Sequence, residues 1–254
     1  MVRLIVYNIE YCEGITGKRW LEYLKFWRVL FPPKMLDIKI MEAIKKLKPD
    51  ILALVEVDIG SIRARKDRGR FFETSLDMMD IVEIVNYPKI GWLKLLSYVP
   101  ILNKQANALI AKYQFSNIRH HVLSKGVKRI VIEATVKLPK EVTLLLAHLS
   151  LGKRARRKQI TELTQIVTSI SNPVILMGDF NTFKGEKEIM ELLEKTHLFH
   201  KYKMNSSILT QPSVNPKRCM DYVLTSKDIH IKNYKVLNYD FSDHLPILVD
   251  FDVN

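Results

Sequence analysis

The stretch Val174-Ile-Leu-Met-Gly-Asp-Phe-Asn-Thr182 places two polar side chains directly after a short apolar run. The apolar residues 174–177 predict a short buried strand, and Gly178 allows a close turn at its end. Asp179 and Asn181 follow at alternate positions, which face the same way in extended chain. A carboxylate and a carboxamide at a strand end suit a ligand site in a layered α/β protein, although the pair would also fit an Asx turn.

Similar polar residues stand at the ends of other apolar runs along the chain. They are Asn8, Glu56, Asn107, His148, Asp221, Asp243 and His244. Each has a simple structural explanation, such as a turn cap for Asn8 or Asp243 and a hydrogen-bonded core position for His148. As a set, they offer the hard oxygen ligands that suit Mg²⁺ or Mn²⁺ and the imidazoles that transfer protons.

One strand–helix–strand pattern positions the first of these residues. Val2 to Tyr7 predicts a buried strand that ends at Asn8. Residues 35–47 carry apolar side chains at helical spacing, and 51–55 predict the next strand, with Glu56 at its end.

The same pattern occurs again later in the chain. Residues 144–147 predict a strand that ends at His148, 155–170 predict a helix, and 174–177 lead to Asp179. Two such halves facing each other would gather four polar side chains at one edge. These are Asn8, Glu56, His148 and Asp179.

Further strands are expected in the middle and near the C-terminus. They cover 106–111, 129–137, 141–146, 220–224 and 245–251, with a hairpin turn at 138–140. We therefore predict an α+β fold: a four-layer α/β/β/α sandwich of two packed mixed sheets with outer helices.

Composition limits the classes of protein. The 254 residues are 47% hydrophobic and show no linker, which predicts a single domain over 1–254. The net charge of +13 favours polyanionic partners, either nucleic acid or an anionic membrane surface, although excess lysine could simply aid solubility. Cys12 and Cys219 form no disulfide framework or zinc spacing. Without a signal peptide or an apolar run of about 18 residues, we expect a cytoplasmic monomer that could lie at a membrane surface.

The motifs resemble those of the endonuclease/exonuclease/phosphatase superfamily, which has the fold of pancreatic deoxyribonuclease. Gly178-Asp-Phe-Asn181 and Ser242-Asp-His244 are the most specific signals. The other matching stretches follow in family order: Tyr7-Asn-Ile9, Leu54-Val-Glu-Val57, Ala106-Asn-Ala-Leu-Ile110, Ala147-His-Leu-Ser150 and Met220-Asp-Tyr-Val223. The resemblance implies a metal-dependent phosphoric-ester hydrolase, a nuclease or other phosphodiesterase that uses Mg²⁺ or Mn²⁺.

The resemblance also implies a set of metal ligands. Glu56 would be the main ligand, with Asn8 beside it and Asp243 contributing directly or through water. Asp179 would orient or deprotonate the attacking water, or bind a second metal ion. Asn107 would support the site.

Further residues take catalytic roles by the same resemblance. Asn181 would donate to a phosphate oxygen, and His148 would face the phosphate as a second histidine and candidate general acid. His244 would contact the phosphate and transfer a proton, while Asp221 fixes its tautomer.

The substrate stays open among nucleic acid, phospholipid and phosphomonoesters. The abasic-site enzymes have Glu-Thr-Lys where this chain has Glu56-Val-Asp58, and a tryptophan where it has Lys217-Arg-Cys-Met220, so abasic-site recognition is not expected. Two basic clusters favour nucleic acid, unless they are solvated helix faces. The first cluster comprises Arg63, Arg65, Lys66, Arg68 and Arg70, and the second comprises Lys153, Arg154, Arg156, Arg157 and Lys158. The candidate substrate contacts among them are Arg63, Arg65, Arg154 and Arg157.

Two aromatic insertions favour a lipid substrate. Trp20 to Phe31 resembles an interfacial amphipathic segment with Trp20 and Trp27 on its apolar side, and residues 91–102 are similarly apolar. Ordinary core packing and stacking on single-stranded bases are alternatives. The leading hypothesis is a nuclease, followed by a sphingomyelinase-like phosphodiesterase at a membrane surface and then a phosphomonoesterase. A non-enzymatic binding module of the same fold would be expected to lose catalytic residues, and this chain keeps them.

Overall fold

The computed structural model describes residues 1–14, 32–33, 35–64, 66–87, 98–199 and 208–253. The strands are β1 Val2–Asn8, β2 Ile51–Asp58, β3 Asp80–Val85, β4 Gln105–Ala111, β5 Phe115–Val122, β6 Ile130–Lys137, β7 Glu141–His148, β8 Val174–Asp179, β9 Asp221–Thr225, β10 Ile229–Val236 and β11 Ile247–Val253. The α-helices are α2 Leu36–Leu47, α3 Arg68–Ser75, α4 Lys153–Thr168 and α5 Met190–Thr196. Short 3₁₀ helices are η1 Glu10–Cys12, η5 Leu102–Lys104 and η6 Gly185–Glu188.

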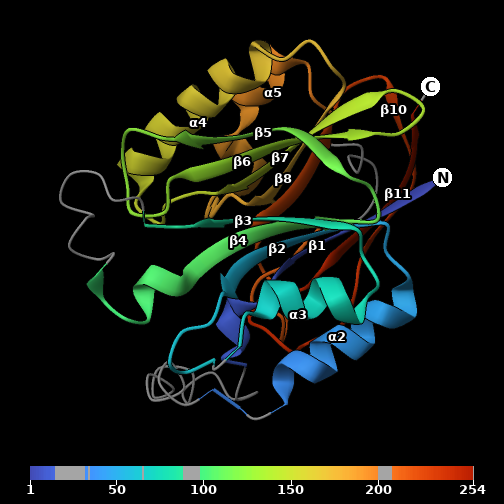
Figure 1. The fold of residues 1–254 in the computed structure, drawn as a ribbon. Helices are drawn as coiled ribbons and strands as arrows, with labels where there is room; N and C mark the ends of the chain where they lie inside the picture. Colours follow the sequence, from blue (N-terminus) through green and yellow to red (C-terminus); the bar gives the residue numbers. More distant parts are fainter. Residues whose placement is uncertain (15–31, 34, 65, 88–97, 200–207, 254) are drawn as a thin grey trace.

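These strands form two mixed sheets that pack face to face. The six-stranded sheet has the order β10-β11-β1-β2-β4-β3, and the five-stranded sheet has the order β5-β6-β7-β8-β9. Helices α2 and α3 cover the outer face of the first sheet, while α4 and α5 cover the outer face of the second (Figure 1). The predicted four-layer α/β/β/α sandwich is confirmed.

The two strand–helix–strand halves are present as predicted. Strand β1 pairs in parallel with β2, and α2 connects them; β7 pairs in parallel with β8, and α4 connects those. The hairpin between β6 and β7 is also confirmed, since Leu138 N donates to Lys140 O at 3.0 Å. Because each pair of strands is parallel, both carboxyl ends of each half meet at the same edge of their sheet.

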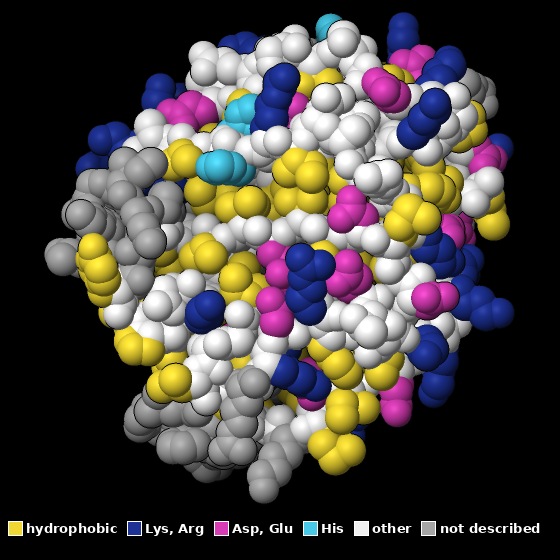
Figure 2. Space-filling model, in the orientation of Figure 1, with side chains coloured by type: hydrophobic (Ala, Val, Ile, Leu, Met, Phe, Trp, Pro, Cys, Tyr) yellow, Lys and Arg dark blue, Asp and Glu magenta, His cyan; other side chains and the backbone are white. Residues whose placement is uncertain are grey.

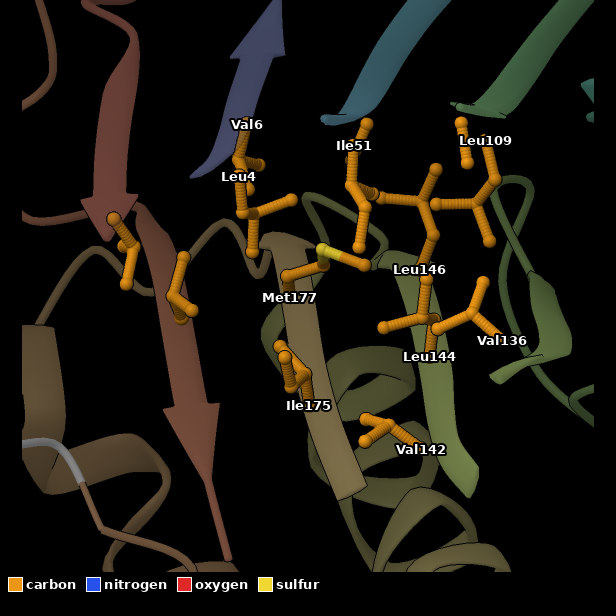
Figure 3. Packing of buried hydrophobic residues seen from close by; sticks show 14 of the residues in the cluster. Leu4, Val6, Ile51, Leu109, Val136, Val142, Leu144, Leu146, Ile175 and Met177 are labelled. Carbon is orange, nitrogen blue, oxygen red and sulfur yellow. The ribbon is translucent and has the colours of Figure 1, made fainter. Parts of the chain in front are cut away.

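Apolar side chains fill the space between the sheets. Figure 3 shows Leu4 and Val6 of β1 facing Met177 and Ile175 of β8 across this core. Strand side chains alternate between faces, so the next residue on this side of β1 is Asn8, and the next on β8 is Asp179. The polar residues therefore continue the core rows at the point where the sandwich ends.

Among the strands and α-helices of the described residues, sequence patterns missed β3, β5, β10, α3 and α5. Strands β3, β5 and β10 lie at sheet edges, where fewer side chains are buried and alternation is weak. Helix α3 begins where the Asp67 side chain accepts from Arg70 N at 3.0 Å, a cap hidden inside what reads as a basic cluster.

Figure 2 shows Lys and Arg side chains interspersed with acidic ones over the face it presents. Among the described residues, no helix is both long and apolar enough to cross a membrane.

Candidate active site

Three polar residues stand in one row across the five-stranded sheet. His148 of β7 is paired with Asp179 of β8, and Asp179 is paired in turn with Asp221 of β9. Gly178 makes this row possible, because its φ of 126° suits glycine and an added Cβ would lie 2.0 Å from Ala147 O. The close approach of β7 and β8 therefore sets His148 beside Asp179.

Glu56 of the opposite sheet reaches the site through a bulge. The pairing of β2 with β4 shifts between Leu54 and Val57, and Glu56 within that shift has a left-handed φ of 59°. Leu54 faces the helices, so strict alternation would also turn Glu56 toward them. The strained backbone, which costs on the order of 1 kcal/mol, instead turns Glu56 between the sheets. Asn107 Oδ1 accepts from Glu56 N at 3.2 Å and holds the bulge.

Side chains from the two sheets meet at this edge. Asn8 Nδ2 donates to Asp179 Oδ2 at 3.1 Å. His148 Nε2 lies 3.5 Å from Asp179 Oδ2 and 3.8 Å from Glu56 Oε1. The structure therefore brings together Asn8, Glu56, His148 and Asp179, which the repeated strand–helix–strand pattern predicted to lie at one edge.

The Ser-Asp-His motif joins the same cluster from the loop before β11. His244 Nδ1 lies 2.7 Å from Asp221 Oδ2, which orients the ring and leaves Nε2 facing the site, 3.9 Å from Asp179 Oδ2 and 4.0 Å from Asp243 Oδ1. Ser242 Oγ donates to Asn8 O at 2.7 Å and ties this loop to β1. Burial lowers the pKa of His244, but the Asp221, Asp243 and Asp179 carboxylates outweigh it and raise the pKa well above its ordinary value. These carboxylates therefore favour the protonated imidazole.

Asp179 has the properties of a proton acceptor at neutral pH. Burial, and to a lesser extent the nearby Asp221 carboxylate, raises the pKa of Asp179 from 3.8 to about 7. Asn181 N donates to Asp179 Oδ1 at 2.9 Å, and Asn181 Nδ2 donates to Leu149 O at 2.9 Å and to Asp179 Oδ2 at 3.3 Å. Asn181 would have to release one of these bonds to donate to a phosphate oxygen.

Lys128, from the loop between β5 and β6, is a further cation in the site. Its Nζ donates to Glu56 Oε1 and lies 2.9 Å from His148 Nε2. Burial lowers the pKa of Lys128, but Glu56 outweighs burial and raises it, so the group is an ammonium. Burial, and then the Lys128 charge, hold the pKa of His148 well below its ordinary value. An ammonium only donates, so neutral His148 accepts at Nε2, which disfavours the predicted role as general acid.

The donors at this edge fit a divalent cation. Asp179, Asp221 and His244 could offer ligand atoms within 4.8 Å of one another, and Asp221 Oδ1 is buried without a hydrogen-bond partner among the described residues. Metal binding and protonation at His244 Nε2 exclude each other, and Glu56, Asn8 and Asp243 offer further oxygen ligands at the same edge. Hard oxygen donors of this kind suit Mg²⁺ or Mn²⁺.

The candidate substrate contacts have different outcomes. Arg63 is buried and paired with Asp58 at 2.8 Å and Glu13 at 2.8 Å, so the prediction that it binds substrate is corrected. The wider clusters lose Arg68, which is buried and donates to Tyr11 O, and Arg156, which is buried against Glu188. Arg154 and Arg157 are exposed on α4. Arg65, Trp20, Trp27 and the rest of Trp20 to Phe31, together with residues 91–97 of the second insertion, lie outside the described residues.

Sequence reasoning missed Lys128 and the role of Ser242. Lys128 is one of 40 lysines and arginines, so its residue type alone does not distinguish it. The only available signal is Gly126 two residues earlier, in a stretch between predicted strands.

The fold matches solved structures at low sequence identity. The catalytic domain of human Nocturnin with bound sulfate is 19% identical, with a TM-score of 0.69 and coverage of 100% of this chain and 94% of that one. A mannosyl-6-phosphatase from Bacteroides thetaiotaomicron is 15% identical, with a TM-score of 0.70 and coverage of 99% and 100%. ANGEL2, a 2',3'-cyclic phosphatase in complex with adenosine-2',3'-vanadate, is 15% identical, with a TM-score of 0.68 and coverage of 98% and 95%.

A search of curated proteins found no match for the sequence. The model of the Endonuclease/Exonuclease/phosphatase family matches residues 31–244, which include every motif from Glu56 to His244. The chain belongs to the endonuclease/exonuclease/phosphatase family.

Proposed function

We propose that this chain is a phosphodiesterase that uses Mg²⁺ or Mn²⁺ and acts on nucleic acid. Its family makes it a phosphoric-ester hydrolase, and the family depends on divalent metal ions. The observation that carries the proposal is the convergence of Glu56, Asp179 and His244 at one edge of the sandwich, with interatomic distances below 4 Å linking His148 to Glu56 and Asp179, and His244 to Asp179.

The residues can divide the chemistry of hydrolysis among themselves. Deprotonated Asp179 accepts a proton from water while the water oxygen forms a bond to phosphorus. The bond from phosphorus to the leaving oxygen breaks, and protonated His244 gives its Nε2 proton to that oxygen. Glu56, Asn8 and Asp243 would hold the cation, which when bound neutralises charge on the phosphoryl oxygens.

Helix α4 supplies the argument for a polyanionic substrate. Arg154, Arg157 and Lys158 are exposed on it, and the helix begins five residues after His148. Buried Arg156 donates to Leu151 O at 2.6 Å, which ties the first turn of α4 to the chain leaving β7. The helix that carries the basic face therefore begins close to the site along the chain, and its exposed side chains can contact phosphates beyond the one that is cleaved.

A substrate panel tests this proposal. Metal-stripped protein is assayed with Mn²⁺, with Mg²⁺ and with excess chelator on single-stranded DNA, RNA, a nucleoside 2',3'-cyclic phosphate, mannose 6-phosphate and sphingomyelin. We expect metal-dependent cleavage of DNA or RNA. Preference for mannose 6-phosphate or sphingomyelin would replace nucleic acid with a phosphomonoester or a lipid, and full activity in excess chelator would contradict metal dependence.

The salt dependence of binding tests the role of α4. Because each released counterion contributes about one unit to the slope of log affinity against log salt, Arg154→Gln with Arg157→Gln should flatten that slope by roughly two units. Lys45→Gln with Lys46→Gln is the matched control, since both lysines are exposed on α2 in the opposite layer. Equal slopes for the two double variants would mean that α4 is only a solvated face.

A further inference from the structure

Lys128 joins the two sheets at the centre of the candidate active site. Glu56 belongs to the six-stranded sheet and His148 to the five-stranded sheet, and the Lys128 ammonium contacts both. The Lys128 side chain is 21% exposed, against 11% for Glu56. Lys128 is therefore a largely enclosed cation that keeps some contact with solvent.

Helix α4 holds the loop that carries Lys128. Lys128 O accepts from Ser150 Oγ at 3.0 Å and from Gln159 Nε2 at 2.6 Å, and Gln159 is fully buried. Ser124 N, at the start of the loop, donates to Glu162 Oε2 at 2.7 Å. The backbone is thus anchored at both ends of the loop. These hydrogen bonds hold the Lys128 ammonium in the site.

Close packing fixes the middle of the same loop. Gly126 has a φ of 95°, and an added Cβ would lie 2.0 Å from Ser150 Oγ and 2.9 Å from Gln159 Nε2. A side chain at this position would be strained and would push the loop away from α4. Because the backbone is anchored, Lys128 can move only through rotation about the bonds of its own side chain.

The charges make Lys128 and a divalent cation competitors for Glu56. Lys128 already donates to Glu56 Oε1, and two cations on one carboxylate oxygen repel each other strongly in a partly buried site. Cation binding would therefore release the Lys128 ammonium from Oε1. The group still needs an anionic partner near His148, and a phosphoryl oxygen supplies one when substrate is present.

We propose that Lys128 is a catalytic residue that neutralises Glu56 in the metal-free protein and binds a phosphoryl oxygen of the substrate when a divalent cation takes Glu56. This inference rests on the proposed function, because it needs Glu56 as a metal ligand and a phosphoester as substrate. An ammonium on that oxygen stabilises the charge that develops as the phosphorus–oxygen bond breaks.

Binding measurements on Lys128→Met test the proposal without relying on turnover. In metal-stripped protein, calorimetry should show Mn²⁺ binding about tenfold more tightly than in the parent, since one charge-assisted hydrogen bond no longer competes. In Mn²⁺-loaded protein, inorganic phosphate should bind about tenfold more weakly. The hydrolysis rate on the best panel substrate should fall roughly 10²-fold, as for loss of one charge-stabilising donor.

Two other variants control for charge and folding. Lys125→Met removes the same charge from an exposed position in the same loop, and it should leave all three measurements unchanged. Lys128→Arg keeps the charge and should retain part of the rate and a Mn²⁺ affinity near the parent value. Should Lys128→Met not fold without metal, Lys128→Gln replaces it, because it keeps a donor toward Glu56 and lacks the charge.

The outcomes separate this inference from the proposed function. Equal Mn²⁺ affinity in the parent and Lys128→Met overturns the competition, and a tighter Mn²⁺ site with unchanged phosphate binding makes Lys128 a structural counter-ion only. Either result in a parent that hydrolyses phosphoesters leaves the proposed function standing. A parent that binds no Mn²⁺ and hydrolyses no phosphoester would contradict both.

Discussion

The two strand–helix–strand halves of the molecule present their acids in different ways. In the first half, Glu56 stands on a strained bulge, and its charge is met by Lys128 from a loop of the opposite sheet. In the second half, Asp179 stands in regular register between β7 and β9, beside a protonated His244. Glu56 is thus held in an ion pair with a cation from the opposite sheet, whereas Asp179 has a raised pKa that suits proton exchange.

This difference indicates how one repeated pattern performs two tasks. Parallel strands that end at one edge bring four polar residues together, and their local backbone then decides their roles. The bulge turns Glu56 between the sheets, and the enclosed position of Asp179 raises its pKa to about 7. Substitutions at Glu56 in the first half should therefore change cation binding. Substitutions around Asp179 in the second half should change proton transfer.

The largest effect is expected from removing the carboxyl group of Glu56. Glu56→Gln should lower the metal-dependent hydrolysis rate by at least roughly 10³-fold, because the cation loses its main charged ligand. Initial rates over a range of Mn²⁺ concentrations measure this. Glu133→Gln is the control, since Glu133 is buried in β6 and pairs with His121 away from the cluster. A Glu56→Gln enzyme that keeps the parent rate would remove Glu56 from the metal site.

A smaller loss should follow from removing His244, the proposed general acid that lies beside Asp179 of the second half. His244→Asn should reduce the rate roughly 10²-fold, as expected for a general acid, while Mn²⁺ affinity stays near that of the parent. Rates on substrates with progressively better leaving groups give the diagnostic. The deficit should shrink as the leaving group needs less protonation, and a constant deficit would mean that His244 does not protonate the leaving oxygen.

Displacing the loop that links the halves should have an intermediate effect. Gly126→Ala forces a Cβ against Ser150 Oγ, so Lys128 should be misplaced and the rate should fall about tenfold, with about 1–3 kcal/mol lost in stability from overpacking. Gly152→Ala is the matched control, because a Cβ there meets nothing within 4 Å and the φ is −71°. Similar rates in the two variants would show that the loop does not deliver Lys128.

The smallest effect concerns the stability of the metal-free protein with pH. Asp179 has its pKa raised from 3.8 to about 7, so its contribution is full below pH 3.8 and is lost as the pH rises through about 7. His244 is also raised, so its contribution is full below 6.5 and is lost as the pH rises through its folded pKa. Melting temperatures between about pH 5 and 8 should therefore fall less steeply in Asp179→Asn than in the parent. The same dependence of melting temperature on pH in Asp179→Asn and the parent would show that Asp179 titrates at its ordinary pKa.

The sequence predicted which side chains stand at the sheet edge but not every backbone feature that positions them. His148 and Asp179 follow from apolar runs that end at a polar residue, which local spacing reveals. The bulge at Glu56 depends on the register of β2 against β4, and β4 lies about fifty residues later, so spacing carries no trace of it. The interpretation that placed Glu56 after the end of a strand therefore found the residue and missed its geometry.

Charged residues were the hardest to place from sequence. Lys128 reaches the site only because Gln159 and Glu162 of α4 hold its loop, a contact between distant parts of the chain. Arg63 was predicted to bind substrate, but it is buried inside the fold in ion pairs with Asp58 and Glu13. A count of basic residues does not distinguish an arginine that binds a carboxylate inside the protein from one that meets a polyanion outside.

The division of labour between the halves is tested most directly by measuring Mn²⁺ binding to metal-stripped parent, Glu56→Gln and Asp221→Asn by calorimetry. If the cation belongs to the first half, Glu56→Gln should lose binding by at least about tenfold, as when a buried charged ligand is removed. Asp221→Asn should bind within about twofold of the parent, since Asp221 serves His244. Loss of Mn²⁺ binding in Asp221→Asn with binding retained in Glu56→Gln would place the cation in the Asp179–Asp221–His244 cluster and contradict this account.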